Sequence, residues 1–328
     1  MIAITSLLVA VSILILALML DLVFGDPSPN YPRRIQFRLH PTVWMGKLTK
    51  ALEPHFKNPN PKIEKLNGFL LALSVITAFT LPVYFGLKII YTYLGILVYI
   101  LVAAVILKLT ICMKLETDWG IAAAKAIESG DLTEARKYAH FSRRDNKELT
   151  GPQIVSSVVE SLAENLTDFR LSPIFYYGFF GVPGAIAFRA VNTLDGMVGF
   201  KDPEHLHIGW FSAVFDTIVN YIPARLTTLL IILAAAILGE AYKSAWAIAR
   251  RDQAKIPSTN HGWQMASMAG ALRVQLEKPG HYAVGDQIEE LDSNKIIRSL
   301  RIRNVAIILA ILLMLPVFLL TSTYLFPI

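Results

Sequence analysis

Residues 69–87, FLLALSVITAFTLPVYFGL, and residues 89–107, IIYTYLGILVYILVAAVIL, are two uncharged stretches separated by Lys88 alone. A helix of about 20 apolar residues crosses the roughly 30 Å hydrocarbon layer of a bilayer. Both stretches are therefore predicted to be spanning helices that form a tight hairpin. Pro82 and Gly86 are compatible with this prediction, because neighbouring helices satisfy the backbone groups that such breaks release.

Three further stretches complete a prediction of about five transmembrane helices, within a range of four to six. Residues 2–20 and 304–326 are uncharged. Residues 208–239 are apolar but contain two charged residues and Pro223, so this span is predicted to be broken or re-entrant. The predicted fold class is an all-α polytopic membrane protein with helical cytoplasmic loops, forming one membrane-embedded domain over residues 1–328.

The composition supports a membrane protein. Of the 328 residues, 54% are hydrophobic and only 17% are charged, and there is a single cysteine. These values exclude a disordered chain and a disulfide scaffold. The net charge of +6 comes from Lys and Arg spread beside apolar runs, so no nucleic-acid partner is expected. A cleaved signal peptide at residues 2–20 is disfavoured, because no Lys or Arg precedes the apolar run.

The distribution of Lys and Arg predicts which segments face the cytoplasm. Basic residues are enriched in cytoplasmic loops of membrane proteins. The segments predicted to be cytoplasmic on this basis are 25–68, 108–207 and 240–303. The protein is therefore expected in the cell membrane, with its polar loops in the cytoplasm. Within these loops, residues 116–140 are predicted to form two short helices separated at Ser129-Gly130-Asp131.

An even number of crossings is needed between residues 170 and 240 to return the chain to the same side. Either residues 171–191 and 208–239 both cross, or the second stretch alone is a bent, re-entrant hairpin. The second arrangement is preferred here, because residues 171–191 contain two prolines and Arg189.

Three carboxylates recur at a four-residue spacing in VVESLAENLTD, residues 158–168. A helix would place Glu160, Glu164 and Asp168 on one stripe, with Asn165 beside it. Three oxygen ligands suit Mg²⁺, which binds carboxylates, water and substrate phosphates. A solvated acidic face is the alternative. The apolar residues between the carboxylates favour a wet cleft or a membrane interface.

Arg189, Asn192, Thr193 and Asp195 follow an apolar run. Arg binds carboxylate or phosphate with paired hydrogen bonds, while Asn and Asp can hold a metal or an amine. The alternative is a helix start that is capped by Asn192, with Arg189 at the membrane interface.

Three loops carry further candidates. Arg144 and Asp145 in one loop, and Arg251 with Asn260 in another, suit the binding of anions, although internally paired surface loops explain them equally well. In a third loop, Asp26 and His40 each precede a proline, which favours an extended backbone. His40 has metal or acid–base potential but, as a single His, is more often structural. Trp44 is expected to anchor the loop at the membrane interface or to bind substrate.

Motifs for nucleotide binding are absent from the sequence. It contains no G-x-x-x-x-G-K-[ST] and no G-x-G-x-x-G, and the absence of C-x-x-C argues against a cysteine zinc site. Any nucleotide must therefore be bound in another way than by a P-loop or a Rossmann site.

The motifs together resemble one family, the integral-membrane adenosylcobinamide-phosphate synthases of cobalamin biosynthesis, known as CbiB. The resemblance covers nearly the whole chain. It is carried by D-x-x-x-G-D-P at 21–27, H-P-x-x-W-M-G at 40–46, R-R-D at 143–145, E-S-x-A-E-N-x-x-D at 160–168, R-A-x-N-T-L-D at 189–195 and M-A-G-A-L at 268–272. The chain departs from the family pattern at His261, where Ala is usual, and at Gln264-Met265, where Pro-Glu is usual.

The resemblance implies an ATP- and Mg²⁺-dependent ligase. The propionate of adenosylcobyric acid would be joined to (R)-1-amino-2-propanol phosphate, or a related amino alcohol, giving adenosylcobinamide phosphate. The expected partners are these two substrates, the lipid bilayer and other cobalamin-assembly enzymes. Glu160, Glu164 and Asp168 would bind Mg²⁺ or act as the base, with Asn165 orienting them and Asp195 completing the catalytic set. The residues implied in binding substrate or phosphate are Arg144, Asp145, Arg189, Asn192, Thr193, Arg251, Asn260, Asp26, His40 and Trp44.

Other functions remain open on the sequence. A transporter is the main one, because Asp216 and Arg225 lie within apolar sequence and such charges often mark substrate paths. A phosphotransferase acting on lipid alcohols would need a D-G-x-x-A-R motif, of which only Asp195-Gly196 is present. A non-catalytic membrane scaffold for corrinoid-pathway enzymes is the third alternative.

Overall fold

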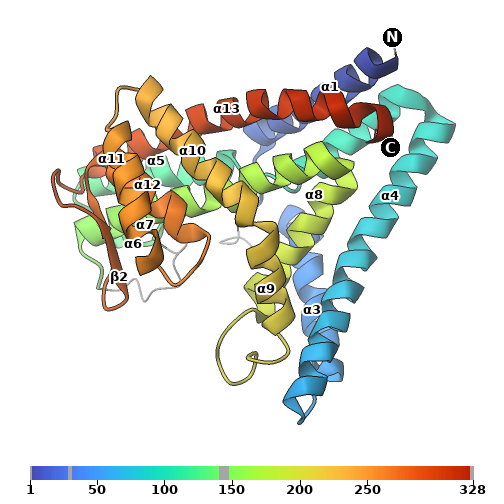
Figure 1. Ribbon diagram of the computed structural model, residues 1–328, viewed down its shortest axis with the longest axis horizontal. Coiled ribbons are helices and arrows are strands. Elements are labelled where there is room, and N and C mark those ends of the chain that lie inside the picture. Colours follow the sequence, from blue (N-terminus) through green and yellow to red (C-terminus); the bar gives the residue numbers. More distant parts are fainter. Residues whose placement is uncertain (1, 29–31, 140–147, 326–328) are drawn as a thin grey trace. The chain divides into compact units, whose positions relative to one another are not determined.

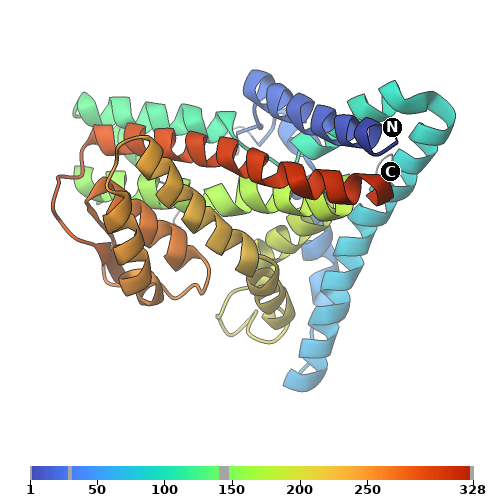
Figure 2. The same ribbon diagram turned by 45° about the horizontal axis from the view of Figure 1, so that its top comes forward.

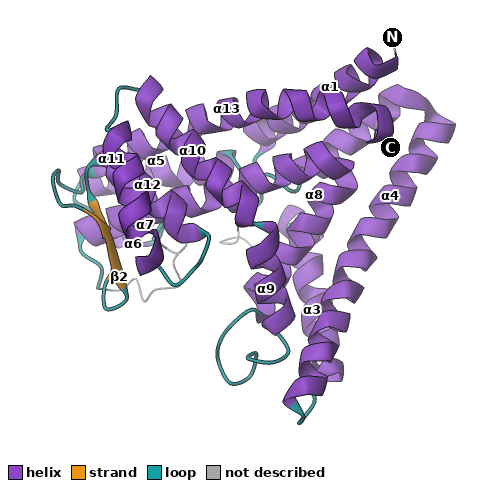
Figure 3. Ribbon diagram, in the orientation of Figure 1, coloured by secondary structure: helices purple, strands orange, loops and turns teal. Residues whose placement is uncertain are grey.

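The computed structural model describes residues 2–28, 32–139 and 148–325, and most of these residues are helical (Figures 1 and 3). Within them, four helical runs are long and apolar enough to cross a membrane, or five if the broken pair α9 and α10 counts as one span. The predicted fold class, an all-α polytopic membrane protein, is confirmed. By its internal contacts the chain divides into two compact units of interleaved segments, while the single membrane-embedded domain stays a prediction. Interleaving of this kind depends on tertiary contacts that no local sequence pattern records.

The first unit comprises the described parts of residues 1–114, 172–219 and 313–328. Its elements are α1 (Ile2–Phe24), α2 (Ile35–Leu39), α3 (Pro41–Phe56), α4 (Pro61–Lys108), α8 (Ser172–Val198), α9 (Trp210–Val219) and the end of α13 (Ser293–Leu325). Helix α4 packs against α1, α3, α8 and α9, and the packing of α3 beside α4 can be followed in Figures 1 and 2. The Tyr177 hydroxyl of α8 donates to the Ala10 carbonyl of α1 at 2.7 Å, so a buried polar group also joins these helices.

The second unit comprises the described parts of residues 115–171 and 220–312. Its elements are α5 (Lys114–Glu128), α6 (Leu132–Arg136), α7 (Gly151–Leu166), the π turn η2 (Thr167–Leu171), α10 (Tyr221–Ile237), α11 (Tyr242–Asp252), the 3-10 turn η3 (Gln253–Lys255), α12 (His261–Leu272) and the first part of α13. Strands β1 (Gln275–Lys278) and β2 (Tyr282–Gly285) form an antiparallel hairpin, with Gln275 opposite Gly285 and Lys278 opposite Tyr282.

Helix α12 lies at the centre of the second unit, in contact with α7, α10, α11 and the β-hairpin. A Cβ atom at Gly270 would lie 2.6 Å from the carbonyl oxygen of Ser244 on α11. Only glycine permits this close approach of the two backbones. The small residues of M-A-G-A-L are therefore explained by helix packing.

The predicted hairpin between residues 69 and 107 has its break in a different place. The helix continues through Lys88 and is interrupted at Gly95, where φ is 81° and ψ is 175°. Only glycine adopts this backbone conformation without steric cost. Lys88 is exposed and its flexible stem lets the charge leave the apolar surface, so the charge does not end the helix.

The segment predicted to be cytoplasmic from 108 to 207 contains a candidate span, which includes the stretch 171–191 of the arrangement that we did not prefer. Elements α7, η2 and α8 form one helical run, Gly151–Val198, that is long and apolar enough to cross a membrane. Pro173 lies just after the π turn η2, at which the regular hydrogen-bond pattern of the helix already changes. Pro183 follows Gly181, at which the helix is already broken (φ 66°). The prolines therefore do not prevent the run from being helical.

Two further expectations concern helix breaks. Residues 208–239 are divided into α9 and α10 at Asn220, and Pro223 lies in the first turn of α10. The two short helices expected within residues 116–140 are confirmed as α5 and α6. Gly130 has φ 75°, and the Asp131 side chain accepts the Glu134 N–H at 2.9 Å to cap α6.

Candidate functional site

Glu164, Asp168 and His261 bring three potential ligand groups together in the second unit. The Nδ1 atom of His261 lies 3.1 Å from Oε1 of Glu164, and its Nε2 atom lies 3.4 Å from Oδ2 of Asp168. One ligand atom from each residue lies within 4.8 Å of the others. The Oδ1 atom of Asp168 is buried and has no hydrogen-bond partner in the described part of the chain. This cluster can hold a cation or move a proton.

The two carboxylates belong to consecutive elements of one helical run. Glu164 lies in the last turn of α7, and Asp168 lies in the π turn η2. Such π turns insert an extra residue into a helix and are frequent at functional sites. The Thr167 hydroxyl donates to the Thr227 hydroxyl of α10 at 2.9 Å and accepts a hydrogen bond from Gln264 of α12. All three of these side chains are buried, so they hold the π turn against its neighbours.

His261 is the first residue of α12, and the preceding loop is tied to α10. The Arg225 guanidinium donates to Oδ1 of Asn260 and stacks on the Tyr221 ring, with 3.7 Å between the guanidinium carbon and the ring centroid. A Cβ atom at Gly262 would lie 2.0 Å from the carbonyl oxygen of Gln253, so only glycine fits there. The side chain of Asn260, predicted to bind substrate, is engaged in this internal contact.

Glu160 is placed differently from the predicted carboxylate stripe. Its carboxylate accepts hydrogen bonds from Ser156 at 2.7 Å and from Tyr282 of β2 at 2.7 Å. The Ser156 hydroxyl also accepts the Glu277 N–H of β1 at 2.8 Å. Glu160 therefore fastens the β-hairpin to α7, and His261 takes its place as the third member of the cluster.

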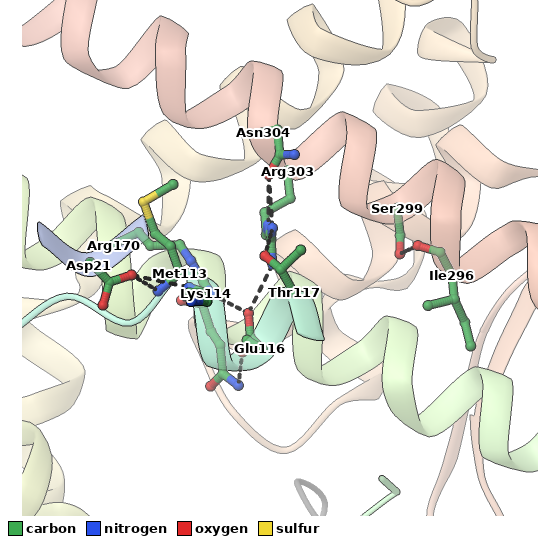
Figure 4. A network of polar contacts seen from close by, with 11 residues as sticks. Asp21, Met113, Lys114, Glu116, Thr117, Arg170, Ile296, Ser299, Arg303 and Asn304 are labelled. Carbon is green, nitrogen blue, oxygen red and sulfur yellow. Dashed lines mark hydrogen bonds and ion pairs between the residues drawn. The ribbon is translucent and has the colours of Figure 1, made fainter. Parts of the chain in front are cut away.

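Asn165 belongs to a buried charge network that the sequence did not indicate, and Figure 4 shows Glu116, Arg170 and Arg303 of this network. Its side chain donates to Oε1 of Glu116 at 2.7 Å. The other Glu116 oxygen accepts a hydrogen bond from Arg170, and Nη1 of Arg303 lies 3.5 Å away. Arg303 also donates to the Thr117 hydroxyl at 2.6 Å. Asn165 thus orients Glu116, where we expected it to orient the carboxylate stripe.

A second cluster of predicted residues lies in the first unit. The Lys108 ammonium donates to the Asp26 carboxylate and to the Gly25 carbonyl, and lies 3.5 Å from Oδ1 of Asp21. Nε2 of His40 lies 3.7 Å from Oδ1 of Asp26. Burial alone raises the pKa of Asp26, but the neighbouring His40 and Lys108 outweigh it and hold that pKa below its usual value. His40 and Lys108 also line a cavity of about 420 Å³ between apolar side chains of α1, α2 and α4.

The motif from Arg189 to Asp195 forms part of α8. Arg189 is buried, and its guanidinium donates to the Thr110 carbonyl at 2.8 Å and to Oδ1 of Asn192 at 3.2 Å. Thr193 donates to the Arg189 carbonyl within the same helix at 2.8 Å. Asp195 is partly buried and close to Gly199, whose N–H donates to its carbonyl at 2.8 Å. Arg189 therefore supports the irregular backbone that follows α4.

The remaining candidates do not join either cluster. Trp44 is half exposed, with the Lys47 ammonium 4.6 Å from its ring centroid. Arg251 binds the Asp252 carboxylate through two hydrogen bonds and the Asp286 carboxylate through two more. This is the internally paired loop that we gave as the alternative to an anion site. Arg144 and Asp145 lie outside the described residues.

The Arg251–Asp252 pair leads to a prediction about pH. Burial raises the pKa of Asp252, but hydrogen bonds from Arg251, Lys255 and the Gly285 N–H lower it well below its usual value of about 3.9. A lowered folded-state pKa stabilises the protein above about pH 4, and this contribution is lost as the pH falls further. Asp252→Asn should therefore lower the free energy of unfolding by about 2–3 kcal/mol at pH 7.

Thermal unfolding in detergent at a series of pH values measures this effect. The difference between wild type and Asp252→Asn should shrink as the pH falls below 4, because the carboxylate is protonated first in the unfolded chain and then, at lower pH, in the folded protein. Asp286→Asn is the matched control, because Asp286 is about half exposed and its loss should cost less than about 1 kcal/mol. Equal stability of wild type and Asp252→Asn at pH 7 would contradict the prediction.

Sequence reasoning missed His261, Glu116 and Lys108 as members of these clusters. Lys108 directly follows a long apolar run, which is a detectable signal that a charge will need a partner, and Glu116 comes eight residues later. His261 carries no such signal, because it lies far along the chain from Glu164 and Asp168.

The fold and the cluster define a class of protein: a polytopic helical membrane protein with a carboxylate–imidazole site between its helices. Residues 14–316 match the protein family described as CobD/Cbib protein. The chain therefore belongs to the CobD/CbiB family, which confirms the resemblance noted in its motifs.

Named relatives cover almost the same length. The chain is 36% identical over 299 residues to the probable cobalamin biosynthesis protein CobD of Methanothermobacter thermautotrophicus, which covers 91% of this chain and 95% of that protein. It is 36% identical over 280 residues to the cobalamin biosynthesis protein CobD of Dehalococcoides mccartyi (85% and 88% covered). It is 38% identical over 279 residues to the probable cobalamin biosynthesis protein CobD of Methanocaldococcus jannaschii (83% and 87% covered). No solved structure gives a significant match. These relatives support a role in cobalamin biosynthesis.

Proposed function

We propose that this membrane protein is the ligase that joins an amino alcohol to a corrinoid carboxylate. The substrates would be adenosylcobyric acid, (R)-1-amino-2-propanol phosphate or a close analogue, and ATP. The site would face the cytoplasm, where ATP is available. The observation that carries this proposal is the cluster of Glu164, Asp168 and His261, in a chain whose relatives are cobalamin biosynthesis proteins.

Amide formation from a carboxylate needs activation, because a carboxylate is a poor electrophile. Transfer of the γ-phosphoryl group of ATP to the propionate oxygen would give an acyl phosphate and ADP. The amine then attacks the acyl carbon, a C–N bond forms, the C–O bond to phosphate breaks, and the amine loses a proton. A site for this reaction must hold the reacting groups together and stabilise the phosphoryl charge.

The cluster can supply these functions. Carboxylate oxygens of Asp168 and Glu164 fit Mg²⁺, and the buried Oδ1 atom of Asp168 lacks a hydrogen-bond partner in the described part of the chain. When bound, Mg²⁺ neutralises phosphate charge. Glu164 is about one-third exposed, so it is accessible to accept the proton from the attacking amine. His261 bridges the two carboxylates and fixes their orientation.

One of the two charged residues that suggested a transporter, Arg225, has a structural role. Arg225, one of the two charges within the apolar stretch 208–239, is bound to Asn260 and stacked on Tyr221. It therefore stabilises the start of α12, which explains its presence without a substrate path.

An assay with purified protein tests the proposed ligase directly. The protein, in detergent or nanodiscs, is incubated with adenosylcobyric acid, Mg-ATP and aminopropanol phosphate, and the corrinoid mass is followed. We expect the corrinoid mass to increase by the mass of the aminopropanol phosphate less one water, with one ADP and one phosphate formed per product. Omitting ATP, or replacing the phosphorylated amine with aminopropanol, gives the matched controls. Product without ATP, or no product from protein that is folded and binds corrinoid, would refute the ligase.

A further inference from the structure

The third member of the cluster is a nitrogen donor, and this bears on which metal ion the protein itself binds. Two carboxylates and one imidazole converge, with ligand atoms within 4.8 Å of one another. Nε2 of His261 and Oδ2 of Asp168 are 3.4 Å apart. Metal–ligand bonds of about 2.0–2.2 Å place neighbouring donors about 3.0–3.5 Å apart. The spacing of these two atoms already suits two ligands of one ion.

A second observation concerns Asp168 alone. Its side chain is about nine-tenths buried, and its Oδ1 atom has no hydrogen-bond partner in residues 2–28, 32–139 and 148–325. Leaving a buried carboxylate oxygen unsatisfied is costly. A cation held by this carboxylate would compensate that cost.

The donor set favours some ions over others. Mg²⁺ binds oxygen ligands and keeps most of its water, whereas imidazole suits first-row transition ions. Affinity for a mixed nitrogen and oxygen site rises from Mn²⁺ through Fe²⁺ and Co²⁺ to Zn²⁺ and Cu²⁺. One imidazole with two carboxylates leaves other positions of the ion for water or a phosphate oxygen.

We propose that Glu164, Asp168 and His261 bind a divalent transition ion, such as Mn²⁺, Co²⁺ or Zn²⁺, and that His261 makes the site prefer this ion over Mg²⁺. This ion would take the place at the cluster that the proposed ligase reaction gave to Mg²⁺, and Mg²⁺ would instead reach the enzyme bound to ATP. The inference concerns metal binding to the free protein, so it is independent of whether the ligase proposal holds.

A competing explanation of the same geometry needs no metal. A protonated imidazole can bridge two carboxylates by hydrogen bonds from both ring nitrogens. The two explanations differ in outcome, because a bridging imidazolium gives no saturable metal binding at this cluster.

Metal titration of the full-length protein in detergent, without ATP or corrinoid, separates them. Mn²⁺ binding is followed by electron paramagnetic resonance, with Mg²⁺ as competitor. We expect one Mn²⁺ per chain, displaced only by at least a tenfold excess of Mg²⁺. His261→Ala should weaken Mn²⁺ binding at least tenfold while changing Mg²⁺ binding less than twofold.

The chain offers a matched control, because Glu53, Glu204 and His205 form another cluster of potential ligands in the first unit. His205→Ala removes the imidazole of that cluster and should leave Mn²⁺ binding at Glu164, Asp168 and His261 unchanged. If His205→Ala abolishes binding and His261→Ala does not, the proposed site is wrong.

A measurement on the wild-type protein covers the case in which His261→Ala does not fold. Pulsed electron paramagnetic resonance of the Mn²⁺ complex detects coupling to a directly bound imidazole nitrogen. If nitrogen coupling is seen in the wild type, and both the coupling and the Mn²⁺ affinity are lost in Asp168→Asn, the result supports the site. Absence of saturable Mn²⁺ or Co²⁺ binding, or Mn²⁺ binding without nitrogen coupling, overturns the proposal.

Discussion

Asp168→Asn is expected to abolish amide formation, with a loss of at least about 1,000-fold in kcat/KM. The substitution keeps the size of the side chain but removes the negative charge that faces His261. Glu164→Gln should have a similar effect, because an amide cannot accept the proton of the attacking amine. Corrinoid mass after incubation with Mg-ATP and the amine measures the loss.

Glu160→Gln is the informative comparison. If the three carboxylates acted as one stripe, this substitution would be as damaging as the other two. The structure instead places Glu160 between Ser156 and Tyr282, and a glutamine oxygen can still accept a hydrogen bond there. We expect a loss of less than tenfold. Equal losses of activity in all three variants would show that Glu160, Glu164 and Asp168 act together, and would contradict the role assigned to His261.

Glu116→Ala is expected to destabilise the protein by about 3–5 kcal/mol. Arg170 and Arg303 are almost fully buried, and the Glu116 carboxylate is the anion that faces both. Removing it leaves two guanidinium charges in a poorly solvated position. Thermal unfolding and the yield of detergent-soluble protein measure the effect. Asp118→Ala is the matched control, because Asp118 lies on the same helix with an exposed side chain.

A double-substitution cycle adds a stricter test of the same network. Because Arg170 loses its partner in Glu116→Ala, the further substitution Arg170→Ala should cost less there than in the wild-type background. Strictly additive losses would show that the two side chains do not depend on each other. Wild-type stability of Glu116→Ala would show that the buried charges are compensated elsewhere.

The fold class was predictable because membrane spans leave a strong local signal. Uncharged runs such as 69–87 and 304–326 identify helices by length and polarity alone. The position of a break depends on one backbone conformation, and Gly95 differs little in sequence from Gly86, which remains helical. The helical run Gly151–Val198 was not predicted as a span, because two of its prolines were counted against it. In the structure both of these prolines occupy positions that tolerate them.

The candidate site was predictable in its local part only. Four-residue spacing correctly placed Glu164 and Asp168 on one face of a helical run. The same spacing included Glu160, whose partner Tyr282 comes from a hairpin more than a hundred residues away. His261 likewise reaches the cluster through tertiary packing. Which carboxylates share a site was thus decided by long-range contacts that spacing does not encode.

The break at Gly95 alters how membrane crossings should be counted along the chain. At about 1.5 Å per residue, the part of α4 from Gly95 to Lys108 is roughly 20 Å long, shorter than a hydrocarbon layer of roughly 30 Å. The part of α4 after Gly95 is therefore too short for a second full crossing of its own. An irregular chain within a bilayer is tolerated only where protein groups satisfy its backbone. The Thr110 carbonyl is bound by Arg189, and the Met113 and Lys114 N–H groups donate to Asp21, as Figure 4 shows for the latter two. The buried side chains of Arg189 and Asp21 thus bind backbone groups that water would bind in an exposed loop.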